Sequence, residues 1–132
     1  MIGIDTNVLA RFFLDDDPVR SPIAARFLEH DLSAERPGYI NPLTLAELVW
    51  TLRRHPRFDR RGLITLLEDL LAFENVVIGE SACVSRALAA YKAGGAGFVD
   101  YLIAELNAAA GASPTVTFDR KAGLRDPFSP LS

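Results

Sequence analysis

Four carboxylates that lie far apart in the sequence are the residues of this chain best suited to chemistry. Asp5 follows a short apolar run, and Asp119 follows a second one. Glu47 and Asp100 each lie near the start of an apolar stretch with helical periodicity. In an open parallel α/β sheet, strand ends and helix starts meet at the carboxyl edge, where ligands bind. We therefore expect the four side chains to meet at one crevice.

Such a group of acids is a natural site for a divalent metal ion. Two carboxylates about 5 Å apart repel each other by roughly 3 kcal/mol at an effective dielectric of about 20. A divalent cation removes this repulsion, and hard oxygen ligands suit Mg²⁺ or Mn²⁺. The same cation activates water for attack on a phosphate ester. The pattern therefore predicts metal-dependent phosphate chemistry.

Two of the acids have a simpler structural role open to them. Asp5 could cap the helix that follows it, although Thr6 and Asn7 are also suited to that position and would leave Asp5 free. Asp119 could cap a short turn. Thr117 lies two residues earlier on the same side of its strand, where its hydroxyl could bond a carboxylate or a metal-bound water.

The other two acids are placed within helices. Glu47 has apolar residues at i−4, i−1 and i+3, which predicts a poorly solvated carboxylate that is paired or bound to a metal. A buried ion pair with an arginine is the alternative. Asp100 suits the first turn of its helix through the helix dipole. The small Ala104 one turn later leaves room for a ligand.

A cluster of basic residues follows the helix that carries Glu47. The net charge of −3 argues against a strong nonspecific nucleic-acid binder, yet the cluster is locally cationic. It is either a solvated corner between helices or a contact for a phosphate backbone. The arginines are Arg53, Arg54, Arg57, Arg60 and Arg61.

The predicted elements alternate between strand and helix. Strands are predicted over residues 2–4, 37–41, 76–78 and 115–118, and helices over 6–14, 22–30, 43–54, 60–73, 81–92 and 98–110. The tail leaves open a short fifth strand. Alternation of this kind predicts an α/β fold, a three-layer α/β/α sandwich with a mostly parallel sheet of four or five strands.

Bulk properties agree with one soluble domain over residues 1–132. The chain is 49% hydrophobic and 23% charged, and it has a single cysteine, Cys83, so no internal disulfide can form. No apolar stretch approaches the roughly 20 residues of a membrane span. We therefore expect a cytoplasmic protein with no membrane partner.

The four segments that carry the acids resemble the PIN domain and, within it, the VapC-type toxins of bacterial toxin–antitoxin pairs. The matching segments are Ile4–Leu9, Leu45–Leu48, Phe98–Ala104 and Thr117–Asp119. This resemblance implies an Mg²⁺- or Mn²⁺-dependent ribonuclease that acts on RNA, is usually a homodimer and is held inactive by a VapB-type antitoxin.

The resemblance also implies roles for individual residues. Asp5, Glu47, Asp100 and Asp119 would be the metal-binding and catalytic acids, and Thr6, Asn7 and Thr117 would be supporting polar groups. Many relatives carry a further acid three positions before the third one. This chain has Gly97 there, a difference that bears on a second metal.

Two other functions fit part of the pattern. A metal-dependent phosphatase of the haloacid-dehalogenase type also begins from an Asp after its first strand, but it needs a second Asp two residues later. This chain has Asn7 at that position. The second alternative is a catalytically silent module that uses the same fold to bind a partner.

Overall fold

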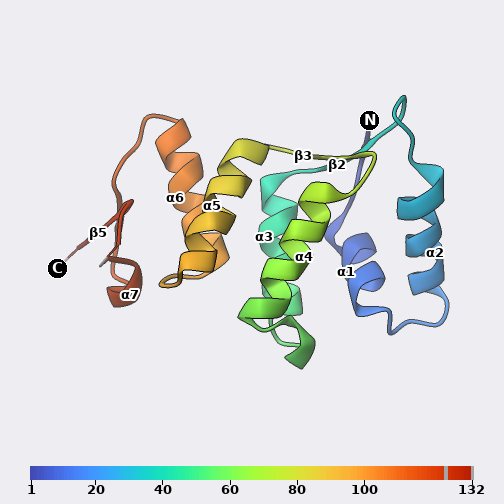
Figure 1. The fold of residues 1–132 in the computed structure, drawn as a ribbon, viewed down its shortest axis with the longest axis horizontal. Helices are drawn as coiled ribbons and strands as arrows, with labels where there is room; N and C mark the ends of the chain where they lie inside the picture. The colour runs from blue at the N-terminus through green and yellow to red at the C-terminus, as the bar shows by residue number, and fades with distance from the viewer. Residues whose placement is uncertain (124, 132) are drawn as a thin grey trace. The chain divides into compact units, whose positions relative to one another are not determined.

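The computed structural model describes residues 1–123 and 125–131 in two units (Figure 1). The first unit is Met1–Gly79 and the second is Glu80–Ser132. Asp5 and Glu47 belong to the first unit, and Asp100 and Asp119 belong to the second.

Three short parallel strands form the sheet of the first unit, in the order β1–β2–β3. They are β1 (Ile2–Gly3), β2 (Gly38–Ile40) and β3 (Val76–Ile78). The central strand β2 ends in Ile40, which has no exposed surface. The backbone N–H of Ile4 donates to the carbonyl of Tyr39 at 2.9 Å, so pairing with β2 extends to the residue just before Asp5.

The helices of the first unit supply most of its buried apolar core. They are α1 (Thr6–Leu14), α2 (Arg20–Arg26) with the π-helical turn η1 (Phe27–Asp31), α3 (Pro42–Leu52), the 3₁₀ turn η2 (Pro56–Phe58) and α4 (Arg60–Ala72). Helix α1 packs against both α2 and α3. Leu9 of α1 and Leu48 and Leu52 of α3 are fully buried. The core of this unit therefore fixes the positions of α1, which begins at Thr6, and of α3, which carries Glu47.

In the second unit two helices pack against each other, and two short parallel strands form a small sheet. The elements are α5 (Ser81–Ala93), α6 (Phe98–Ala109), β4 (Thr115–Thr117), α7 (Arg120–Gly123) and β5 (Phe128–Pro130). Tyr101 is 2% exposed, and its hydroxyl donates to the carbonyl of Gly94 at 2.7 Å and accepts from the N–H of Ala96 at 3.3 Å. These bonds fix the loop that leads into α6 and Asp100.

The predicted α/β class is confirmed, and every predicted strand and helix forms. Among the described residues the five strands form two parallel sheets, three strands in the first unit and two in the second, whereas the sequence predicted one sheet of four or five strands. Phe128–Pro130 is the fifth strand and pairs with β4. Most element ends agree with the prediction to within one or two residues. Helix α3 begins at Pro42 because the side chain of Asn41 accepts from the N–H of Thr44 at 2.9 Å.

The helix predicted over residues 22–30 differs from the structure at both ends. It begins at Arg20 because the Asp17 carboxylate accepts from the backbone N–H groups of Arg20 at 2.8 Å and Val19 at 2.9 Å. The same two donors hold the pKa of the Asp17 carboxyl below its ordinary value. The α-helical part ends at Arg26, and the chain continues through the wider turns of η1 to Asp31.

Among the described residues, the structure contains no helix with the length and apolar character needed to cross a bilayer.

Candidate active site

Asp5 lies where strand β1 gives way to helix α1. Its Oδ1 accepts from the N–H of Thr6 at 2.8 Å, and Asp5 is the N-cap residue of α1. The expectation that Thr6 or Asn7 would cap this helix and leave Asp5 free is therefore wrong. Capping uses one acceptor position of a carboxylate that has about four. Because Asp5 is also exposed, the rest of its carboxylate is open to a cation.

Glu47 is joined to the start of α1 by a hydrogen bond across the first unit. The Thr6 hydroxyl donates to Glu47 Oε1 at 2.8 Å, and this bond links residues that are 41 positions apart. Packing of α1 against α3 brings the two side chains within reach. Thr6 therefore lies between the two acids of this unit, bonded to Asp5 through its backbone and to Glu47 through its hydroxyl.

The prediction that apolar neighbours shield Glu47 from solvent is wrong. Glu47 is exposed, and two of those neighbours, Leu43 and Trp50, are 71% and 48% exposed. Helix α3 instead buries its other face, which includes Leu45, Leu48 and Leu52. The Glu47 carboxylate is therefore open to solvent.

Asp100 occupies the first turn of α6, as predicted. Its Oδ2 accepts from the N–H of Gly97 at 3.2 Å and caps the helix start. The sequence predicted space for a ligand beside Ala104. In the structure, Ala104 is 1% exposed and packs in the core, so it leaves no such space. A Cβ at Gly97 would lie 3.5 Å from Asp100 Oδ2, an ordinary contact. A larger residue at that position is therefore sterically compatible with Asp100.

Asp119 follows β4 and caps the short helix α7. Its Oδ1 accepts from the N–H groups of Lys121 at 2.9 Å and Ala122 at 3.1 Å. The Thr117 hydroxyl oxygen accepts from the backbone N–H of Asp119 at 3.0 Å. The Thr117 hydroxyl therefore holds the backbone of Asp119. The sequence had predicted that this hydroxyl would bond a carboxylate or a metal-bound water.

The donor set fits a hard divalent cation. Asp5, Thr6 and Glu47 offer oxygen atoms in the first unit, and Asp100, Thr117 and Asp119 do so in the second. Carboxylate and hydroxyl oxygens are the ligands that Mg²⁺ and Mn²⁺ prefer. Within either unit, the part of the chain that the structure describes holds no group of three His, Cys, Asp or Glu side chains around a common point.

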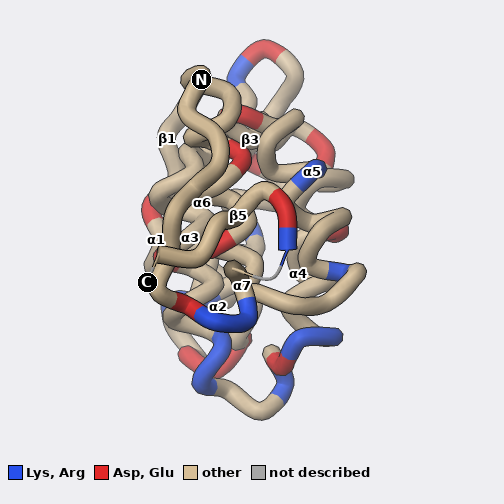
Figure 2. The backbone as a smooth tube through the Cα atoms, turned by 90° about the vertical axis from the view of Figure 1, so that its left-hand side faces the viewer, with Lys and Arg blue, Asp and Glu red and all other residues tan. Residues whose placement is uncertain are grey.

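One member of the basic cluster has a structural role. Arg57 Nη2 donates to the carbonyls of Phe13 and Leu14 at 3.0 Å each, where α1 ends, and its guanidinium lies 5.1 Å from the ring centre of Phe58. A cation is favourable at the carbonyl end of a helix. Arg53, Arg54 and Arg61 are exposed on the same segment, whose basic positions are blue in Figure 2.

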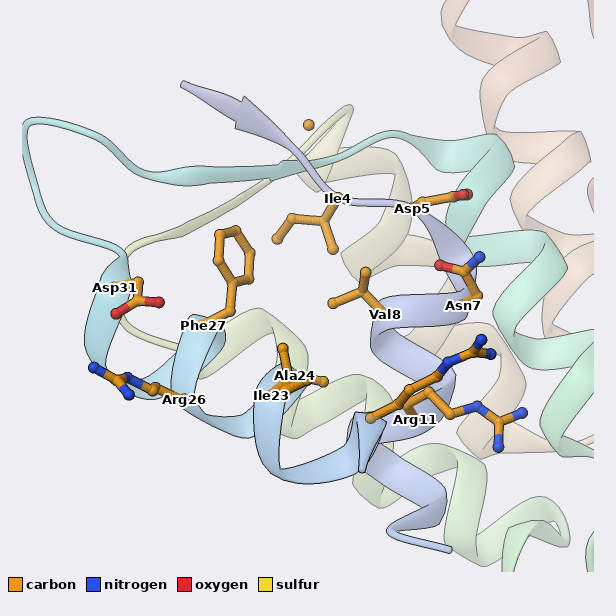
Figure 3. A pocket seen from close by; sticks show the side chains of 12 residues that line it. Ile4, Asp5, Asn7, Val8, Arg11, Ile23, Ala24, Arg26, Phe27 and Asp31 are labelled. Atoms are coloured by element: carbon orange, nitrogen blue, oxygen red, sulfur yellow. The ribbon is translucent and has the colours of Figure 1, made fainter. Parts of the chain in front are cut away.

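A pocket of about 850 Å³, which the sequence patterns did not predict, lies between α1 and the α2–η1 segment. Figure 3 shows Ile4, Val8 and Phe27 directed toward one another across it. Asp5 and Asn7 lie at one end of this pocket. A usable signal was present, because Ile23 and Phe27 are apolar residues on one face of a helix that already buries Ala24 and Leu28.

A family model described as the PIN domain matches residues 2–126. The chain belongs to the PIN-domain family. The match spans both units and all four acids, so the recognition of a PIN domain from its motifs is confirmed. PIN domains are generally nucleases, and PIN-domain nucleases typically use Mg²⁺ or Mn²⁺. A search of curated proteins finds no match to the chain.

The hydrogen bond from Thr6 to Glu47 can be tested without an RNA substrate. We expect Thr6→Val, which keeps the shape of the side chain but removes the hydroxyl, to weaken Mn²⁺ binding by about 10- to 100-fold, because groups that orient a metal ligand contribute on that order. Thr6→Ser retains the hydroxyl and should bind Mn²⁺ nearly as the wild type does. Isothermal titration with MnCl₂ measures both. Equal affinity in the two variants would show that the bond does not position a metal ligand.

Proposed function

We propose that this chain is an Mg²⁺- or Mn²⁺-dependent ribonuclease that hydrolyses RNA phosphodiester bonds, with residues 1–132 acting as one PIN-like domain. The observation that carries the proposal is the Thr6–Glu47 hydrogen bond next to the Asp5 cap, inside a chain matched to the PIN family. It gathers two carboxylates and a hydroxyl from separate elements on an exposed face. The family match also favours nuclease chemistry over the haloacid-dehalogenase alternative.

The chemistry divides between holding a cation and handling protons. In this proposal Asp5 and Asp100 would hold the cation most directly, and Glu47 and Asp119 would contribute directly or through water. Mg²⁺ or Mn²⁺ held there would lower the pKa of a bound water and offset charge on the phosphate during in-line attack. Thr6 keeps Glu47 in place, and Thr117 keeps the Asp119 backbone in place. Asn7 is exposed beside Asp5, where its amide can donate to a phosphate oxygen.

Within the family, the motifs point to the toxin of a VapBC-type pair. A ribonuclease active against the RNA of its own cell must be restrained, and a small VapB-type antitoxin would do so. Exposed carboxylates such as Asp5 and Glu47 attract a guanidinium, which can bind a carboxylate bidentately in place of the metal. Leu43 and Trp50 give α3 an exposed apolar surface, which suits either this partner or a second copy in a homodimer.

Neutralising the proposed metal ligands tests the chemistry. Asp5→Asn and Asp100→Asn should each lower RNA cleavage by at least about 100-fold, the order of a lost transition-state charge contact. The fold should survive, because an Asn Oδ1 can still accept from the N–H of Thr6 or Gly97. Cleavage of labelled RNA with Mg²⁺ and with EDTA measures the first effect, and thermal melting measures the second.

The matched control for these variants is Asp69→Asn, an exposed carboxylate on α4 that the proposal does not use. It should cleave RNA as the wild type does. Wild-type rates in Asp5→Asn or Asp100→Asn would show that these acids only cap helices. A wild-type protein that cleaves no RNA with either metal would favour the silent interaction module.

The basic cluster should contribute to RNA binding through its charge. We expect the triple variant Arg53→Gln, Arg54→Gln, Arg61→Gln to reduce the slope of log affinity against log salt by up to about 2, since each phosphate contact with single-stranded RNA contributes about 0.7. Fluorescence anisotropy from about 50 to 200 mM salt measures this slope. Arg36→Gln, an exposed arginine before β2, is the control. An unchanged slope would identify the cluster as a solvated surface.

The toxin role has a test of its own in cells. Expression of the wild type should arrest growth, and Asp5→Asn, which keeps the cap of α1, should not. Co-expression of the small protein encoded beside this gene should restore growth, and the two products should co-purify. Harmless expression of an enzyme that cleaves RNA in vitro would leave the nuclease assignment intact and exclude the toxin.

A further inference from the structure

The pocket beside Asp5 has an apolar middle and polar, charged ends, and a ligand must match both. Its middle is apolar, formed by Ile4 and Val8 on one side and Phe27 on the other. Asp5, Asn7 and Arg11 lie toward one end, and Arg26 and Asp31 lie toward the other (Figure 3). At about 850 Å³ it falls within the roughly 300–1,000 Å³ typical of small-ligand sites.

The apolar middle suits a flat ring. Phe27 is half-buried and lines the pocket from η1, so its ring is held by packing yet remains reachable. Aromatic faces of this kind stack nucleobases without regard to sequence. Phe27 is the first residue of η1 and lies four positions after Ile23, so both side chains face the pocket, and π-helical turns occur frequently at functional sites.

The end of the pocket that holds Arg11 suits a phosphate. Arg11 donates from Nη1 to Asp16 at 3.1 Å, a bond that uses one of the five donors of its guanidinium. The exposed Arg20 also lines the pocket. Both arginines can therefore donate to a phosphate oxygen, and guanidinium groups match phosphate geometry bidentately. An apolar partner helix would have no comparable use for these two cations.

The pocket adjoins the candidate active site, and this position indicates which ligand it binds. Asp5 caps α1 and also lines the pocket, as does Asn7 two residues later. We propose that this pocket binds the base of one RNA nucleotide adjacent to the scissile phosphate, stacked on Phe27, with Arg11 and Arg20 on the neighbouring phosphate. This inference rests on the proposed ribonuclease function and gives that site a single-stranded substrate with one unstacked base.

The test scans an RNA oligonucleotide of about ten nucleotides that the wild type cleaves, with one abasic residue placed at each position in turn. For the wild type, kcat/KM should fall by about 5- to 100-fold when the abasic residue is next to the cut. Phe27→Ala should lower kcat/KM on the intact RNA by a similar factor and should show no further loss at that position. The two losses coincide only if Phe27 contacts that base.

Two further variants separate stacking from other effects. Phe27→Leu keeps an apolar side chain of similar size but has no aromatic face, so it should resemble Phe27→Ala toward RNA while melting like the wild type. Val19→Ala, which truncates an exposed apolar residue outside the pocket, should leave the abasic profile unchanged.

The possible outcomes are distinct. If Phe27→Ala keeps the wild-type abasic profile, the nucleotide site is excluded and the ribonuclease function stands. If Phe27→Ala and Phe27→Leu cleave RNA normally and Phe27→Ala loses only the antitoxin, the pocket belongs to a protein partner and the inference is wrong. If the wild type cleaves no RNA with either metal, the proposed function fails and this inference fails with it.

Discussion

Holding several carboxylates in fixed positions is the constraint on which the candidate site depends. Three of the four acids meet it in the same way, because Asp5, Asp100 and Asp119 each accept backbone N–H groups at the start of a helix. A helix start carries a partial positive charge that favours an anion by about 0.3–1 kcal/mol. These acids therefore have favourable local partners whether or not a metal is bound, and their positions follow directly from where the helices begin.

Glu47 is the exception, and its partner differs accordingly. It lies within α3, where the backbone N–H groups are already used by the helix, so a hydroxyl from another element supplies its hydrogen bond. This makes the position of Glu47 depend on the packing of α1 against α3. A core change that shifts α1, for example at the fully buried Leu9, would move Thr6 and Glu47 relative to each other without touching either acid.

The positions of the candidate acids within their elements follow from the sequence where local chemistry decides them, and the predictions were wrong where packing decides. Asp100 in the first turn of α6 and Asp119 after β4 follow from local periodicity and capping rules. Asp5, Thr6 and Asn7 are three consecutive residues that all cap helices well, so local preference cannot choose among them. In the structure, Ile4 is the last residue bonded to β2, and this fixes the helix start at Thr6 with Asp5 as the cap.

The exposure of Glu47 and the presence of the pocket were not predicted, because both depend on which helix faces other elements cover. Apolar neighbours at i−4 and i+3 indicate burial only if another element covers that face, and Leu43 and Trp50 show that none among the described residues covers it fully. The pocket residues Ile23 and Phe27 are four positions apart and so share one face of the helix. Helical periodicity identifies that face, but only the packing of α1 decides whether the face is covered or lines a pocket.

Helix α1 connects the candidate site to the pocket because its residues face the core, the pocket and the Asp5 cap in turn. Leu9 and Ala10 are buried in the core, while Val8 and Arg11 line the pocket and Asp5 caps the start. At the far end, Arg57 binds the carbonyls of Phe13 and Leu14 and so ties the helix to the segment that carries the basic cluster. A rotation of α1 large enough to improve one of these contacts would disturb the others. One packed helix of nine residues therefore sets three features. They are the position of the Asp5 carboxylate that caps it, one wall of the pocket, and the carbonyls that hold Arg57.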